Sequence, residues 1–101
     1  MKLRILRGAK DDLRRGFKFY EKQTPSLGAY FLEQLEAEIR ALLPFAGTHS
    51  RLHGAYRAHS QKFPYSIIYE LAAGEMKVFA VVDARRRPAW IKRHIQRRQG
   101  P

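Results

Sequence analysis

Two periods of hydrophobic and polar residues divide the first quarter of the chain. Residues 2–7 largely alternate apolar and basic side chains, which is the pattern of a half-buried β-strand. From Ala9 the apolar positions recur at helical spacing instead, and this pattern continues to Gln23. Asp11 and Asp12 are expected in the first turn of this helix, because carboxylates there complement the positive end of the helix dipole. The chain is therefore predicted to begin with a strand and a helix.

A second amphipathic helix is predicted directly after the first. Thr24 followed by Pro25 has the form of an N-cap and a proline at the first helical position. Pro44 and Gly47 mark the end of this helix. Because so few residues separate the two helices, they are expected to form a helical hairpin. The apolar stripe of the second helix consists of Leu27, Phe31, Leu35, Ile39, Leu42 and Leu43.

The second half of the chain is predicted to supply most of a β-sheet. Residues 46–55 contain turn-forming residues and are predicted to be a loop, and residues 72–75 are predicted to be a hairpin turn. Pro88 is in a position to start a short C-terminal helix. Strand patterns cover residues 56–61, 63–71 and 76–82, and the last is almost continuously apolar, which is typical of a central strand.

These elements predict one α+β domain over residues 1–101. Their order is β-α-α-β-β-β, with an antiparallel-rich sheet packed by the helical hairpin and followed by the short C-terminal helix. A chain of 101 residues is long enough for one modest hydrophobic core. Residues 94–101 are a candidate disordered tail, because chain termini often lack order.

The charge balance points to an anionic partner. The chain carries 20 Lys and Arg against nine Asp and Glu, a formal net charge of +11. Self-repulsion of this size opposes compaction, so folding alone does not explain it. Residues 85–101 hold seven basic side chains and no acidic one. This segment is therefore expected to form a basic face or tail that meets phosphate or a carboxylate-rich peptide.

The composition also excludes several classes of protein and site. The chain has no cysteine, which excludes a disulfide scaffold and thiolate catalysis. No apolar run approaches the ~20 residues of a membrane span, and charges within the first eight residues do not fit a secretory signal, so a cytoplasmic location without membrane contact is expected. His49 and His53 are four residues apart but lie in a predicted loop without a third ligand, so no metal site is expected. Neither a cofactor nor a small-molecule ligand is indicated.

Four motifs occur in order along the chain. They are Ala9-x-x-Asp12-Leu13, Leu27-Gly28-x-x-Phe31, Phe63-Pro64-Tyr65-Ser66-Ile67-Ile68-Tyr69, and Val78-Phe79-Ala80-Val81-Val82 followed by Arg85-Arg86-Arg87-Pro88-x-Trp90. With these motifs the chain resembles the ParE/RelE superfamily of toxins from bacterial type II toxin–antitoxin systems, and in particular the ParE-like, plasmid-stabilisation branch. The resemblance covers nearly the whole chain and implies the fold described above.

The resemblance to the ParE branch implies inhibition of DNA gyrase by binding, without chemistry by the chain itself. It also implies a cognate antitoxin protein as the partner in a hetero-oligomer. The surface that meets the target is expected to be basic and partly aromatic, because arginine forks bind phosphate and tryptophan stacks. Trp90 has a second interpretation, as a side chain packed on the core. The candidate target-binding residues are Arg85, Arg86, Arg87, Trp90, Lys92 and Arg93.

Two alternatives stay open. The resemblance to the RelE branch implies cleavage of ribosome-bound mRNA, in which a ribose 2′-OH attacks the adjacent phosphate. Such a reaction needs proton transfer, which His59 or His94 could supply, and cations for the developing charge. The cations would be Arg57, Lys62 and Arg85 to Arg87. The other alternative is a non-toxic chain that acts only as a co-repressor of its own operon together with its antitoxin.

One position departs from the family pattern. Many relatives carry a histidine just before the arginines, where this chain has Asp83. A carboxylate in that place weakens the inference of histidine-dependent chemistry there. It also predicts an ion pair between Asp83 and one of the three arginines that follow.

Overall fold

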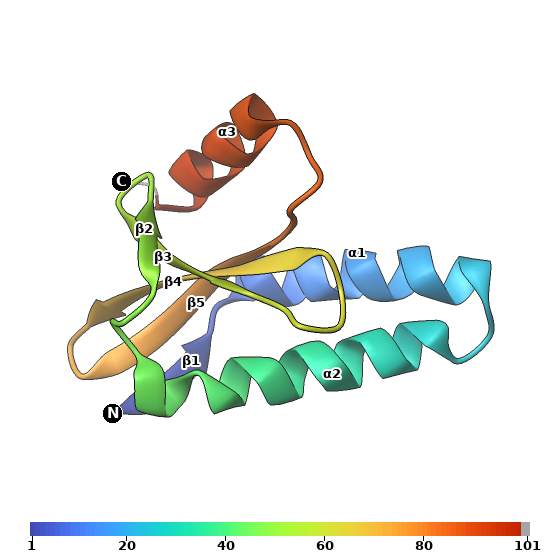
Figure 1. Ribbon diagram of the computed structural model, residues 1–101, viewed down its shortest axis with the longest axis horizontal. Helices are drawn as coiled ribbons and strands as arrows, with labels where there is room; N and C mark the ends of the chain where they lie inside the picture. The colour runs from blue at the N-terminus through green and yellow to red at the C-terminus, as the bar shows by residue number, and fades with distance from the viewer. Residues whose placement is uncertain (100–101) are drawn as a thin grey trace.

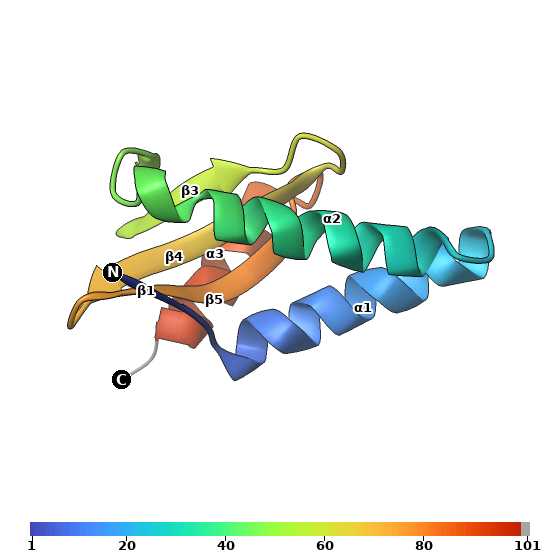
Figure 2. The ribbon, with the colours of Figure 1, turned by 90° about the horizontal axis from the view of Figure 1, so that it is seen from below.

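The computed structural model describes residues 1–99, which form three layers (Figures 1 and 2). The helices α1 (Arg7–Gln23) and α2 (Leu27–Ala41) form the predicted hairpin and cover one face of a sheet. The helix α3 (Pro88–Gln99) covers the other face. Pro88 stands at the start of α3, as predicted, because its fixed φ suits the first helical position.

The sheet has five strands within the described residues, in the order β1-β5-β4-β3-β2. β1 pairs with β5 in parallel, and the other three pairs are antiparallel. The nearly continuous apolar strand is β5, and it lies between β1 and β4, as predicted for a central strand. The antiparallel-rich α+β fold with a C-terminal helix is confirmed. The strands are β1 (Lys2–Ile5), β2 (Ser50–Leu52), β3 (Ala55–His59), β4 (Tyr65–Ala72) and β5 (Glu75–Asp83).

Two hydrophobic clusters form because β4 and β5 are buried on both faces. Alternation along β4 sends Ile67 and Tyr69 toward the hairpin and Ile68 toward α3. A register shift follows, in which Ile68 pairs with Ala80 and Tyr69 with Val78, so that Phe79 is the extra residue of a bulge. The larger cluster includes Leu13, Phe31, Leu35 and Ile39 of the hairpin. The smaller cluster includes Phe79, Val82 and Ile95, with Trp90 and Ile91 at its margin.

Two glycines let α1 and α2 approach closely. A Cβ atom at Gly16 would lie 2.5 Å from the ring of Phe31. A Cβ atom at Gly28 would lie 2.5 Å from the carbonyl oxygen of Phe17. The first contact is with a packed aromatic ring and the second with backbone, so neither neighbour can yield cheaply. The hairpin therefore requires glycine at both positions.

The predicted helix starts need correction. α1 begins at Arg7 rather than Ala9, so Asp11 and Asp12 lie beyond its first turn. The helix begins two residues earlier than the periodicity predicted, because the parallel ladder ends with the hydrogen bond that the backbone N–H of Leu6 donates to the carbonyl oxygen of Val78. The two carboxylates are thus available for tertiary contacts rather than for the helix dipole.

The predicted cap of α2 is also wrong. α2 begins at Leu27, two residues after Pro25, and Thr24 makes no side-chain cap. Instead the carboxylate of Glu21, in the last turns of α1, accepts hydrogen bonds of 2.9 Å from the backbone N–H groups of Ser26 and Gly28. A tertiary contact between helices therefore replaces the local cap.

Two further segments differ from their predictions. Residues 46–55, predicted as loop, contain β2, which pairs with β3 through a tight turn at Gly54. A three-residue strand is too short to show an alternating pattern in the sequence. Residues 94–99, part of the candidate disordered tail, form the last turns of α3, and His94 and Ile95 are buried there. Residues 100 and 101 lie outside the described part.

Candidate functional site

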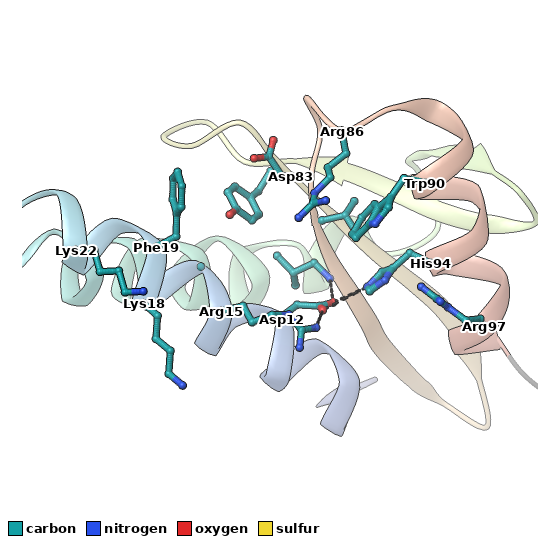
Figure 3. A pocket seen from close by; sticks show the side chains of 14 residues that line it. Asp12, Arg15, Lys18, Phe19, Lys22, Asp83, Arg86, Trp90, His94 and Arg97 are labelled. Atoms are coloured by element: carbon teal, nitrogen blue, oxygen red, sulfur yellow. Dashed lines mark hydrogen bonds and ion pairs between the residues drawn. The ribbon is translucent and has the colours of Figure 1, made fainter.

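A groove of about 680 Å³ lies between α1 and α3, over the C-terminal half of β5 (Figure 3). Its floor is formed by Tyr65 and by residues 81–83 of β5. One side is built by α1 and the other by α3 together with Arg86, which precedes that helix. The α1 side carries Asp12, Arg15, Lys18, Phe19 and Lys22, and the opposite side carries Arg86, Trp90, His94 and Arg97.

The groove exists because β1 is shorter than β5. The parallel ladder ends at the pair Ile5–Val78, and beyond it β5 has no strand partner on that side among residues 1–99. Side chains take over the hydrogen bonds at this edge. Asp12 accepts the backbone N–H of Val81 at 2.9 Å, and Arg98 donates to the carbonyl oxygen of Phe79 at 2.9 Å. Polar side chains thus cover an edge that would otherwise be free to pair.

Asp12 is the centre of a buried ionic cluster. It is only 5% exposed, yet its two oxygens accept hydrogen bonds from several charged or polar groups. Arg98 of α3 binds it through two guanidinium nitrogens at 2.8 and 3.1 Å, and Arg15 binds it at 2.6 Å. Such charge-assisted bonds offset the cost of removing the carboxylate from water. One carboxylate therefore ties α1, β5 and α3 together.

His94 belongs to the same cluster. Its Nε2 lies 3.3 Å from Asp12, and because a carboxylate only accepts, this nitrogen must carry the proton of the imidazole. Burial lowers the pKa of His94; the carboxylate of Asp12 opposes this shift and the charge of Arg98 adds to it. The imidazole is thus held neutral and in one tautomer at neutral pH.

A stack of flat side chains runs from the cluster to the surface. The ring of Trp90 lies 4.7 Å from that of His94, with 11° between their planes. The guanidinium carbon of Arg86 lies 4.2 Å from the centroid of Trp90, within cation–π range. Arg86 is exposed, and its contact with Trp90 holds the guanidinium flat against the indole ring at the mouth of the groove.

Asp83 forms the ion pair that the sequence predicts. Arg85 binds the Asp83 carboxylate in a bidentate manner and donates one hydrogen bond of 3.0 Å from Nε and one of 2.8 Å from a terminal guanidinium nitrogen. This contact holds the pKa of Asp83 below its ordinary value. Beside it, burial raises the pKa of Tyr65 to about 12, so this hydroxyl stays protonated. The charge of Arg85 therefore neutralises the Asp83 carboxylate at the end of the groove.

Of the six predicted target-binding residues, two line the groove and four do not. Arg86 and Trp90 line the groove, and Trp90 also packs beside the smaller core, so both interpretations of this tryptophan apply. Arg85 is held by Asp83. Arg87, Lys92 and Arg93 are exposed but do not line the groove.

The residues considered for mRNA cleavage are not gathered in this groove. Of them, Arg86 and His94 line it. Arg57 and His59 lie on β3, opposite Ile68 and Ser66, on the α3 face of the sheet. His59 contacts the hydroxyl of Ser66 at 3.2 Å, whereas the buried Nε of Arg57 has no hydrogen-bond partner among residues 1–99. Lys62 is exposed in the connection between β3 and β4, and Arg85 is bound to Asp83.

The sequence reasoning missed the α1 side of the groove. Arg15, Lys18 and Lys22 follow one another at three and four residues, so they share one face of α1. Phe19 stands between them and is 49% exposed, although an aromatic residue on an amphipathic helix is expected in the core. This spacing was visible in the sequence, but nothing there showed that α3 would lie opposite.

Two other features are absent from residues 1–99. No three or more side chains of the ligand types His, Asp and Glu come together there in a way that would hold a metal ion. No helix in the described part has both the length and the apolar character required to cross a membrane.

Comparison with known proteins links the fold to a solved structure. No family model matches the chain, and no curated protein matches its sequence. A chain in the structure of the chromosomal ParDE TA system from P. aeruginosa superposes with a TM-score of 0.75. The match covers 82% of this chain and 95% of that one, at 17% sequence identity. The two chains share one fold.

Proposed function

We propose that the chain is the toxin of a type II toxin–antitoxin system, and that it acts in the cytoplasm by binding and poisoning DNA gyrase. The observation that carries this proposal is the likeness to a chain of the ParDE TA system, which extends over 82% of the chain. The motifs that resemble the ParE branch support the same function independently of the superposition.

The geometry favours action by binding over mRNA cleavage. The residues that cleavage would need come from β3, the β3–β4 connection, the segment after β5, and α3, and most of them lie outside the groove. By contrast, Arg86 and Trp90 stand together at the mouth of a basic groove. A held guanidinium beside an aromatic ring is typical of a binding surface, because little side-chain entropy is lost when a partner arrives.

A cognate antitoxin completes the proposal. A net charge of +11 accelerates the capture of an acidic partner through long-range attraction. A segment that folds as it binds can cover a large surface of a small protein. Neutralisation by such a segment would keep the chain harmless while both proteins are present.

The proposal is tested by inducing the chain alone and pulse-labelling DNA and protein in the same culture. DNA synthesis is expected to fall first. Arg86→Ala should require about tenfold more protein for the same arrest, because it removes an anchoring side chain of the binding surface. The matched control is Arg40→Ala, an exposed arginine in the last turn of α2, which should leave the arrest unchanged.

Each other outcome contradicts part of the proposal. If protein synthesis falls first, gyrase is not the target and the mRNA-cleavage alternative takes its place. If neither falls, the chain is not a toxin, and the co-repressor alternative is the one to pursue.

A further inference from the structure

The groove between α1 and α3 carries an excess of positive charge. Lys18, Lys22, Arg86 and Arg97 line it and form no ion pair within residues 1–99. The two carboxylates of the groove do not offset them. Asp12 is bound by Arg15 and Arg98, and Asp83 is bound by Arg85. An anionic occupant would therefore meet four available cations and no available anion.

The cations stand on both sides of the groove, and each side also holds an aromatic ring. Lys18 and Lys22 lie one turn apart on α1, which also carries Phe19, and Arg86 and Arg97 lie on the opposite side with Trp90 (Figure 3). An occupant with charges along its length and flat groups between them matches this arrangement.

The floor of the groove argues against an amphipathic helix as the occupant. Val81, Val82 and Tyr65 are only 3%, 2% and 8% exposed, so they have almost no apolar surface left to bury. Docking of a helix depends mainly on such burial. A chain of phosphates does not, because its affinity comes from the release of counterions as cations approach.

We propose that this groove binds single-stranded nucleic acid. The phosphates lie along Lys18, Lys22, Arg86 and Arg97, and one base stacks on Phe19, whose ring is 49% exposed. A duplex keeps its bases stacked inside and leaves Phe19 without a partner. This inference goes beyond the proposed function, since it concerns the purified chain and requires neither gyrase nor an antitoxin.

The test titrates the full chain into a fluorescein-labelled oligonucleotide of twelve thymidines at several salt concentrations. Four phosphate contacts predict a slope of about −2.8 for log K against log salt, since each contact contributes about −0.7 on a single strand. Lys18→Ala/Lys22→Ala should halve this slope to about −1.4. The charge-matched control Lys10→Ala/Arg40→Ala replaces two exposed cations outside the groove and should keep it near −2.8.

Two readouts tie the binding to this groove. Trp90 is the only tryptophan of the chain, so its fluorescence should change as the oligonucleotide binds beside it. Phe19→Ala should weaken binding about tenfold without changing the salt slope, because it removes stacking and no charge. Phe19 is half-exposed, so this variant keeps the core intact.

Three results would overturn the proposal. If both double variants reduce the salt slope of binding equally, the oligonucleotide is attracted by the net charge of the chain and not by this groove. A twelve-base-pair duplex that binds as tightly as the single strand would exclude a role for base stacking. Displacement of the oligonucleotide by polyglutamate at equal charge, with the same response from Trp90, would assign the groove to an acidic protein. All three are independent of growth arrest, so this test and that of the proposed function can fail separately.

Discussion

Asp12 shows how much one buried side chain can organise in a small domain. It comes from the first helix, satisfies a backbone N–H of the central strand and binds an arginine of the last helix. Within residues 1–99, its neighbour Asp11 pairs only with Arg14, an exposed residue on the same helix. Of these two adjacent aspartates, Asp12 therefore joins three elements of the fold, whereas Asp11 makes a local contact on the surface of α1.

This difference gives a prediction at the residue scale. Asp12→Asn keeps the shape but removes the charge that Arg15 and Arg98 bind, so it should lower the free energy of unfolding by about 2 kcal/mol. Asp11→Asn should change it by less than about 0.5 kcal/mol, because exposed pairs contribute little. Urea denaturation of both variants measures the two values. Equal effects would mean that the buried cluster does not stabilise the fold.

Among the elements, α3 depends most on tertiary contacts. Its apolar residues are few, and Ile95 is its one fully buried hydrophobic side chain. Arg98 adds a second attachment and needs room beside α1, which Gly8 provides. A Cβ atom there would lie 2.8 Å from the guanidinium carbon of Arg98 and closer still to one of its nitrogens. The glycine near the start of α1 is therefore explained by a side chain 90 positions away.

The element-scale prediction concerns this contact between α1 and α3. Gly8→Ala should destabilise the chain by about 1 kcal/mol, because it displaces Arg98 from Asp12 and Phe79. In an Arg98→Ala background the same substitution should be neutral or stabilising by up to about 1 kcal/mol, as alanine is in an ordinary helix. A double-mutant cycle in urea measures the coupling. The same effect in both backgrounds would show that Gly8 and Arg98 are independent.

On the scale of the whole molecule, a high positive charge is combined with a charged cluster inside the fold. The protein places most of its cations on the surface and holds His94 neutral inside. The groups that face His94 are Asp12, Arg97 and Arg98, together with the ring of Trp90. A second positive charge at this place would compete with Arg98 for one carboxylate.

Global stability should therefore depend on pH through His94. Its pKa in the folded chain lies below the ordinary value of 6.5, so the unfolded chain binds more protons once the pH falls under about 6.5. The stabilisation is complete above that pH and is lost as the pH falls toward the folded pKa. His94→Gln cannot titrate and should show a flatter profile between about pH 7.5 and 5, measured by urea midpoints. Parallel profiles of the two proteins would contradict this assignment.

The elements with a local pattern could be predicted from the amino-acid sequence. The period of α1 and α2, the apolar run of β5, the turn at 72–75 and the proline that starts α3 were all predicted, and so was the ion pair of Asp83. Each depends on residues within a few positions of one another, where side-chain spacing and backbone preference act directly.

The contacts that join distant segments became known from the folded structure. β2 is stabilised by its pairing with β3, the cap of α2 is supplied by Glu21, and the edge of β5 is covered by Asp12 and Arg98. For the groove, the sequence indicated Arg86 and Trp90, while the α1 side became apparent once α3 was placed against β5. The hydrogen bonds between Asp12 and Arg98 join residues 86 positions apart, and no local pattern encodes that distance.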